Sequence, residues 1–263
     1  MLSRLPPAVV GFLLASVLST AGAEAAPRAL LPDLDQEAPT GLSVWNARTD
    51  GKDRFLLGFG SAVSNVGEGP LIIDGHRATR ATPRMTVDQL VQWEGAPSHR
   101  VSGVGRMRYV VSADHRHWHY VGFDHYELRS AADGGARRDR KSGFCLGDRY
   151  AVAQQDLSAA APAPIFTSRC GLGQPERLRV REGISVGFGD YYAGNLEGQY
   201  VSLDGLPDGR YTLVHRVNPN RRLRELRYDN NAASVLLSLH WQRGMPRLRV
   251  LARCDDSARC AGP

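Results

Sequence analysis

The chain has 263 residues, of which 42% are hydrophobic, and it carries a formal net charge of +6 at pH 7. The positive charge comes almost wholly from scattered arginines that form no run of five or more, and no nucleic-acid-binding motif is present. We therefore expect no nucleic-acid partner, although the charge suits contact with anionic polymers of a cell surface.

Residues 1–25 have the pattern of a secretory signal peptide. Arg4 is followed by a short apolar run from Ala8 to Leu18 and then by small residues that include Ala23-Glu24-Ala25. The apolar run is too short for a comfortable membrane span, and no later stretch is long enough for one. We expect the mature protein to be secreted, or to lie in the periplasm or cell envelope, without a membrane span. About 235 residues would then remain, enough for one large all-β domain or two small ones.

The rest of the chain has the pattern of one β-rich domain. Residues 26–41 are rich in Pro and Asp and indicate an extended N-terminal linker, which leaves 42–263 as a single domain. From Leu42 onward, short runs of β-forming residues alternate with Gly, Pro, Asn and Asp, and no long helical periodicity is present. This pattern predicts an all-β fold, an antiparallel β-sandwich with long loops and little helix. The predicted strands include one that continues to Leu128 and later ones at 198–203, 209–217, 233–241 and 247–253.

Four cysteines are present: Cys145, Cys170, Cys254 and Cys260. An even number in an exported chain predicts two disulfides. Three pairings are compatible with the sequence, and we expect Cys145–Cys170 and Cys254–Cys260 because neighbours pair most readily. A Cys-His metal site is the alternative, but no C-x-x-C spacing supports it.

Three of the eight histidines, His115, His117 and His119, alternate with other residues inside a β-rich stretch. On a strand they would share one face, and Trp118 would point to the opposite face and pack in the core. Neighbouring same-face residues are roughly 7 Å apart at the backbone, so the strand must bend or bulge if all three hold one ion. An imidazole triad suits Cu, Zn, Fe or Ni. The alternative is a solvent-facing polar strand.

Two further motifs follow the histidines in the chain. The first is Lys141-x-x-Phe144-Cys145, and the second runs from Gly183-Ile184-Ser185-Val186-Gly187 to Asp190-x-Tyr192. With these three motifs in this order, the chain resembles the lysyl oxidase family over roughly residues 105–240. The resemblance implies a β-sandwich of lysyl oxidase type, with the three histidines as Cu²⁺ ligands. It also implies a lysine tyrosylquinone cofactor, formed by a Lys141–Tyr192 crosslink.

The activity implied by this resemblance is that of a copper- and quinone-dependent amine oxidase, similar to protein-lysine 6-oxidase. Such an enzyme uses O₂ to convert primary amines, either peptidyl lysine or small alkylamines, to aldehydes, with release of H₂O₂ and ammonia. Asp190, two residues from Tyr192, is our hypothesis for the base that removes a proton from the substrate carbon. Tyr191 is the neighbouring alternative, and the motif spacing selects Tyr192. We expect Lys141 and Tyr192 to lie on mobile loops flanking the histidine face.

Two other functions are compatible with the residues alone. One is a non-catalytic copper-binding β-sandwich protein of the cell envelope, which has the histidine triad but forms no quinone. The other is a zinc hydrolase, because three histidines and an open coordination position are also a catalytic zinc pattern.

Overall fold

The computed structural model describes residues 27–49, 51–112, 115–138, 143–152, 163–196 and 198–261. Within these ranges every regular element is a strand, and every strand pair is antiparallel. The predicted all-β antiparallel fold with little helix is therefore confirmed. No helix in the described part of the chain is long and apolar enough to cross a membrane. The predicted signal peptide, residues 1–25, lies outside the described residues.

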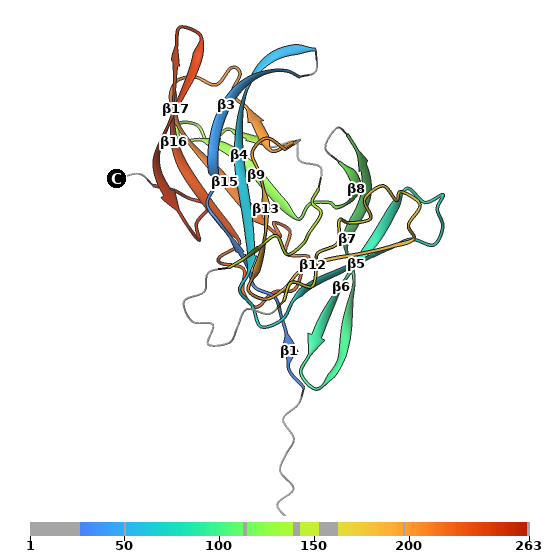
Figure 1. The fold of residues 1–263 in the computed structure, drawn as a ribbon. Coiled ribbons are helices and arrows are strands. Elements are labelled where there is room, and N and C mark those ends of the chain that lie inside the picture. Colours follow the sequence, from blue (N-terminus) through green and yellow to red (C-terminus); the bar gives the residue numbers. More distant parts are fainter. Residues whose placement is uncertain are drawn as a thin grey trace, which may run out of the picture.

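The first sheet carries the histidine motif at its end. Its strands follow the order β12-β5-β6-β7-β8, and the short β1 is added beside β6 (Figure 1). β8 is the end strand, and two loops cover its outer edge. The Trp118 N–H donates to Cys170 O at 2.9 Å, and the Tyr120 N–H donates to Phe144 O at 2.7 Å. The strand bounds are β1 (Ala29–Leu30), β5 (Leu71–His76), β6 (Arg84–Trp93), β7 (Ala96–Val111), β8 (Arg116–Tyr120) and β12 (Arg179–Ile184).

Two further sheets complete the fold. The second has the order β10-β9-β15-β16-β17, and the third has the order β11-β13-β4-β14, with β2 and β3 also paired to β4. The second comprises β9 (Asp124–Ser130), β10 (Ala136–Arg138), β15 (Gly209–Val217), β16 (Ala232–Gln242) and β17 (Met245–Cys254). The third comprises β2 (Leu34–Gln36), β3 (Thr40–Thr49), β4 (Lys52–Asn65), β11 (Tyr150–Ala151), β13 (Phe188–Tyr192) and β14 (Tyr200–Ser202). The four late predicted strands correspond to β14, β15, β16 and β17.

One hydrophobic core joins the three sheets. Val87 on β6, Phe59 on β4 and Leu213 on β15 belong to a single cluster of buried residues. Phe59 packs edge-on against Tyr126 of β9, with ring centroids 4.9 Å apart. Trp118 of β8 is also fully buried in this cluster, as predicted from its place between two histidines. The strand that carries the histidines is therefore fixed from behind by the core.

The segment predicted to be a linker is instead part of the domain. Residues 29–30 and 34–36 are strands that pair with β6 and β4. Leu34 is fully buried, and its N–H donates to a Glu225 carboxylate oxygen at 2.9 Å. A Pro- and Asp-rich composition reports only the local conformational preference of the chain. The contacts that hold this segment involve residues far along the chain. The domain therefore begins before residue 42.

The strand predicted to continue from the histidines to Leu128 is interrupted. β8 ends at Tyr120, a turn follows, and β9 begins at Asp124. Gly122 in this turn has a φ of 77°, a conformation that side-chain-bearing residues rarely adopt. A single glycine within a β-rich stretch thus redirects the chain from the first sheet to the second.

Both predicted disulfides, Cys145–Cys170 and Cys254–Cys260, are confirmed. The first connects the last residue of the lysine motif, Cys145, to the Cys170 loop at the outer edge of β8. It therefore fixes the two pieces of chain that lie beside the histidine strand.

Candidate functional site

The three predicted histidines come together at the end of β8. His117 and His119 are alternate residues of this strand, so they share a face, while His115 lies just before it. The His115 carbonyl accepts the Ser112 N–H at 2.8 Å, which ties the start of β8 to the end of β7. The ring centroids are 4.7–5.2 Å apart. The third ring therefore comes from a residue just before the strand, and it lies beside the other two.

The spacing of the ring nitrogens is close to what a single ion requires, and small rotations of the side chains would complete the fit. Two nitrogens bound to one ion at about 2.0–2.1 Å are at most about 4 Å apart. His117 Nε2 and His119 Nε2 are 2.7 Å apart, and ligand atoms from all three histidines lie within 4.8 Å of one another. An all-imidazole set of this kind suits copper or zinc, and affinity for a given set of nitrogen ligands is higher for Cu²⁺ than for Zn²⁺.

The described part of the lysine motif, Gly143–Cys145, packs against the histidine strand. The Phe144 N–H donates to Tyr120 O at 3.0 Å, and the Tyr120 N–H donates to Phe144 O at 2.7 Å. Gly143 has a φ of 145°, and a Cβ added there would lie 2.9 Å from His119 Cβ and 2.8 Å from Tyr120 O. Only glycine permits this close approach. The K-x-x-F-C motif therefore enters the fold directly beside a predicted metal ligand.

Tyr192 lies against the same segment from the other side. Its ring packs edge-on against Phe144, with centroids 4.8 Å apart. Its hydroxyl has two acceptors, Cys145 O at 3.0 Å and Asp190 Oδ2 at 2.7 Å. Burial, reinforced by the neighbouring Asp190 carboxylate, raises the pKa of Tyr192 well above its ordinary value. The phenol is therefore protonated near neutral pH and donates to a group that can take its proton.

Asp190 is a buried carboxylate with several donors. Besides Tyr192, it accepts the N–H of Gly147 at 3.2 Å and that of Tyr191 at 3.0 Å. Arg149 Nε lies 3.7 Å from Asp190 Oδ1. Burial raises the pKa of Asp190 to about 7, and the bond from Tyr192 and the charge of Arg149 oppose that rise. A carboxyl that titrates near neutral pH is suited to accept and release a proton.

Glu182 is a second buried carboxyl beside this site, and the sequence reasoning missed it. It is fully buried on β12, and its Oε2 accepts the Leu146 N–H at 3.0 Å. The next N–H in the chain, that of Gly147, donates to Asp190, so consecutive amides bind the two carboxyls. Burial and the nearby Asp190 raise the pKa of Glu182 well above its ordinary value. Among the described residues Glu182 has one donor and Asp190 has several, so Glu182 is the member of the pair that holds a proton and Asp190 is the one stabilised as an anion.

The sequence did contain a signal for Glu182. Val180, Glu182 and Ile184 alternate along β12, and all three are buried. Period-2 spacing between two apolar residues places the middle one on the buried face. A carboxylate at such a position is costly unless it is protonated or well bonded, which makes it a candidate for a functional group.

The other predicted positions have different outcomes. Lys141 lies outside the described residues. Tyr192 is not on a loop, since it is the last residue of β13 and is partly buried. Tyr191 is 47% exposed and projects from the opposite face of β13, which favours Tyr192 as the residue at the site.

Comparison with known proteins gives the same family as the motifs. The lysyl oxidase family model matches residues 97–245, more than half of the chain. Similar proteins include lysyl oxidase homolog 3B of Danio rerio, 29% identical over 133 residues, which are 49% of this chain and 14% of that protein. Lysyl oxidase homolog 2 of Gallus gallus is 28% identical over 128 residues, 48% of this chain and 15% of the relative. Lysyl oxidase homolog 3 of Homo sapiens is 27% identical over 129 residues, 49% of this chain and 15% of the relative.

The matched region therefore spans about one seventh of these much longer relatives. The region matched by the family model includes the histidine triad, Asp190 and Tyr192, which the fold brings to the two sides of one segment. From the family match and these motifs, the chain belongs to the lysyl oxidase family.

Proposed function

We propose that this protein is a secreted, copper-dependent amine oxidase that deaminates primary amines, either peptidyl lysine or small alkylamines. The quinone cofactor would form from Lys141 and Tyr192. The observation that carries the proposal is the position of the Gly143–Phe144 segment, which contacts His119 and Tyr120 on one side and the Tyr192 ring on the other. The histidine strand, the Gly143–Cys145 part of the lysine motif and Tyr192 of the tyrosine motif thus lie together, which supports the proposal.

Chain length supports the pairing of Lys141 with Tyr192. Lys141 precedes Phe144 by three residues, and three residues span at most about 11 Å. The Phe144 ring is in contact with Tyr192. On so short a tether the Lys141 amine, once unprotonated, can reach the adjacent oxidised ring as a nucleophile.

The three histidines would hold the copper ion. Copper bound there would promote oxidation of the Tyr192 phenol by O₂. The finished quinone would accept electrons from the substrate amine. Each turnover oxidises one primary amine by two electrons and reduces O₂, so that amine, O₂ and water give aldehyde, ammonia and H₂O₂. The disulfides support an oxidising compartment for this chemistry.

In this proposal Asp190 handles protons at two stages. During cofactor formation its Oδ2 takes the proton of the Tyr192 hydroxyl, which it already binds at 2.7 Å. During turnover the same carboxylate removes a proton from the substrate carbon. Both tasks need the ionised form, which the Gly147 and Tyr191 N–H groups and Arg149 stabilise.

The visible spectrum with and without phenylhydrazine tests the proposal on copper-loaded protein. We expect a coloured hydrazine adduct in the wild type, and its loss in Tyr192→Phe and Lys141→Arg. Tyr191→Phe and Lys52→Arg are the matched controls, and both should keep the adduct. A crosslinked peptide pair containing Lys141 and Tyr192, and H₂O₂ release with an alkylamine, should accompany it. An adduct that survives Tyr192→Phe, or that Tyr191→Phe removes equally, would contradict the assignment.

The second candidate is a non-catalytic copper-binding protein of the cell envelope, which the converging histidine triad favours by itself. Copper content measures metal binding independently of quinone formation. His117→Ala should lose copper, whereas His99→Ala on β7 should not. Copper bound at one ion per chain with no hydrazine adduct in the wild type would favour this second function over the oxidase.

A further inference from the structure

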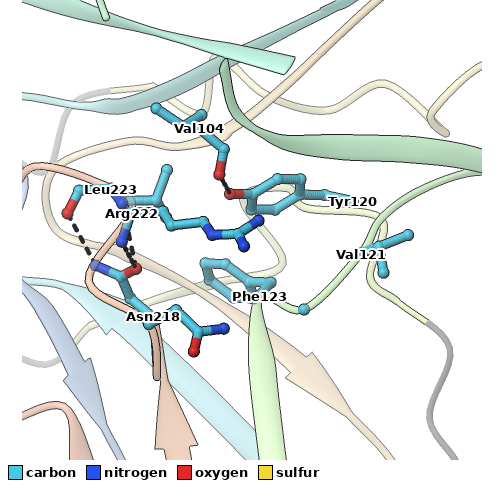
Figure 2. Close-up of a pocket in the computed structure, with 9 residues that line it drawn as sticks. Val104, Tyr120, Val121, Phe123, Asn218, Arg222 and Leu223 are labelled. Atoms are coloured by element: carbon cyan, nitrogen blue, oxygen red, sulfur yellow. Dashed lines mark hydrogen bonds between the residues drawn. The ribbon is translucent and has the colours of Figure 1, made fainter. Parts of the chain in front are cut away.

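A short stretch of chain, Phe144–Gly147, connects two sheets beside the proposed cofactor residues, and we call it the bridging segment. Its first residue, Phe144, makes two backbone hydrogen bonds with Tyr120 of the histidine strand. Tyr120 is held in turn by its own side chain, whose hydroxyl donates to Val104 O at 3.1 Å (Figure 2). The start of the bridging segment is therefore anchored to the first sheet.

Two buried carboxyls hold the other end of the bridging segment. The Leu146 N–H donates to Glu182 Oε2 at 3.0 Å, and the Gly147 N–H donates to Asp190 Oδ2 at 3.2 Å. Glu182 lies on β12 of the first sheet, which also contains the histidine strand, and Asp190 lies on β13 of the third sheet, which also carries Tyr192. Glu182 therefore ties the segment to the sheet of the histidines, and Asp190 ties it to the sheet of the phenol.

The surroundings of Glu182 favour its neutral form. Its side chain is fully buried, and Val180 and Ile184 on the same face of β12 are buried apolar residues, as is its cross-strand partner Ile73. Glu182 Oε1 has no hydrogen-bond partner among the described residues. A carboxylate oxygen without a donor in such an environment costs more free energy than a protonated one, so the carboxyl keeps its proton.

The charged and titratable groups that face Glu182 within the described residues are Asp190 and Tyr192 on β13 and Arg149 just before β11. Burial, reinforced by the charge of Asp190, raises the pKa of Glu182, whereas the Leu146 N–H and Arg149 oppose that rise. A second anion beside Asp190 would repel the first. The two carboxyls therefore carry one negative charge between them near neutral pH, and it lies on Asp190.

We propose that protonated Glu182 is a positioning residue for cofactor formation, which holds the bridging segment to the sheet of the histidines and leaves Asp190 as the one ionised carboxyl beside Tyr192. This role rests on the proposed oxidase function, since it concerns the Lys141–Tyr192 crosslink. Lys141 lies three residues before Phe144, so a shift of the segment would move the amine relative to the phenol. Glu182 takes no part in the bond-making steps, because the proton of the Tyr192 hydroxyl goes to Asp190.

A ¹³C NMR titration of the Asp190 carboxyl in metal-free protein tests the charge of Glu182. Glu182→Gln keeps an acceptor for the Leu146 N–H and cannot ionise, so Asp190 should titrate within about 0.3 pH units of the wild type. If Glu182 were the anion of the pair, removing its charge would lower the Asp190 midpoint by about one pH unit. That shift would overturn the proposal.

The rate of cofactor formation tests the hold on the bridging segment. In Glu182→Leu the Leu146 N–H loses its acceptor, so its amide signal should shift, and the phenylhydrazine-reactive quinone should form roughly tenfold or more slowly. Glu182→Gln should keep the Leu146 signal and form the quinone at a rate within about threefold of the wild type. Glu176→Leu, at an exposed glutamate in the loop before β12, is the control and should change neither signal nor rate. Copper content should be the same in all variants, because Glu182 is not a predicted metal ligand.

Equal rates in Glu182→Leu and the wild type would refute the positioning role, as would a rate in Glu182→Gln as low as that in Glu182→Leu. Amide spectra that match the wild type away from the bridging segment exclude misfolding as the cause, and if Glu182→Leu does not fold, the Glu182→Gln titration and rate decide. A wild type that forms no hydrazine adduct would instead refute the oxidase. The titration and the Leu146 amide, both measured without metal, would then still decide the charge and the contact of Glu182.

Discussion

Removing the charge of Arg149 should raise the pKa of Asp190 by about one unit. Arg149 Nε lies 3.7 Å from Asp190 Oδ1. Two unit charges at this distance interact by about 1 kcal/mol in bulk water and by about 4.5 kcal/mol at an effective dielectric constant near 20. The Arg149 side chain is 34% exposed, so solvent screening favours the lower end of this range. A value near 1.4 kcal/mol corresponds to about one pH unit.

The measurement is a ¹³C NMR titration of the Asp190 carboxyl in metal-free protein. The wild type should titrate with a midpoint near pH 7, since burial raises the pKa of Asp190 to about 7. Arg149→Gln should move that midpoint to about pH 8. Arg149→Lys retains the charge and should titrate close to the wild type. A midpoint unchanged in Arg149→Gln, or shifted equally in Arg149→Lys, would refute the electrostatic argument.

Three other predictions concern stability. Burial raises the pKa of Glu182, so its contribution to stability is full below about pH 4.5 and is lost as the pH rises. Glu182→Gln should therefore gain in Tm relative to the wild type between pH 5 and pH 8, and an advantage that does not grow with pH would contradict this. Leu34→Ala should lower the free energy of unfolding by about 2–5 kcal/mol in urea, because Leu34 is fully buried. Leu226→Ala, at an exposed side chain, should change it by less than about 0.5 kcal/mol, and equal losses would argue against β2 as core. Replacing Cys145 and Cys170 together by Ala should cost about 3 kcal/mol, since this disulfide closes a loop between residues 25 positions apart, and a loss below about 1 kcal/mol would contradict the prediction.

Local pattern was sufficient for most of the fold. Turn residues between β-rich runs predicted β15, β16 and β17 closely, because those turns are set by residues next to one another. The clustering of the three histidines followed from their two-residue spacing, and the third ring comes from His115, just before β8. Both disulfides followed from cysteine number and order.

What the sequence did not provide were contacts between distant segments. Leu34 looked like part of a linker because its partner Glu225 is 191 residues away. Tyr192 looked like a loop residue because the motif around it is rich in glycine, yet β13 pairs with β4 there. Arg149 had no motif to mark it, and it matters only because folding places its guanidinium beside Asp190.

The bonds that hold β2 have a consequence for the order of events during synthesis. The Leu34 N–H is bound by Glu225, and the Gln36 N–H is bound by the Asn230 carbonyl. These partners leave the ribosome roughly 190 residues after the strand they hold, so the N-terminal segment has no complete docking site until nearly the whole chain has been made. A domain that depends on contacts between such distant segments folds slowly. A chain that stays unfolded until its last strands have been made can still pass through a translocation pore.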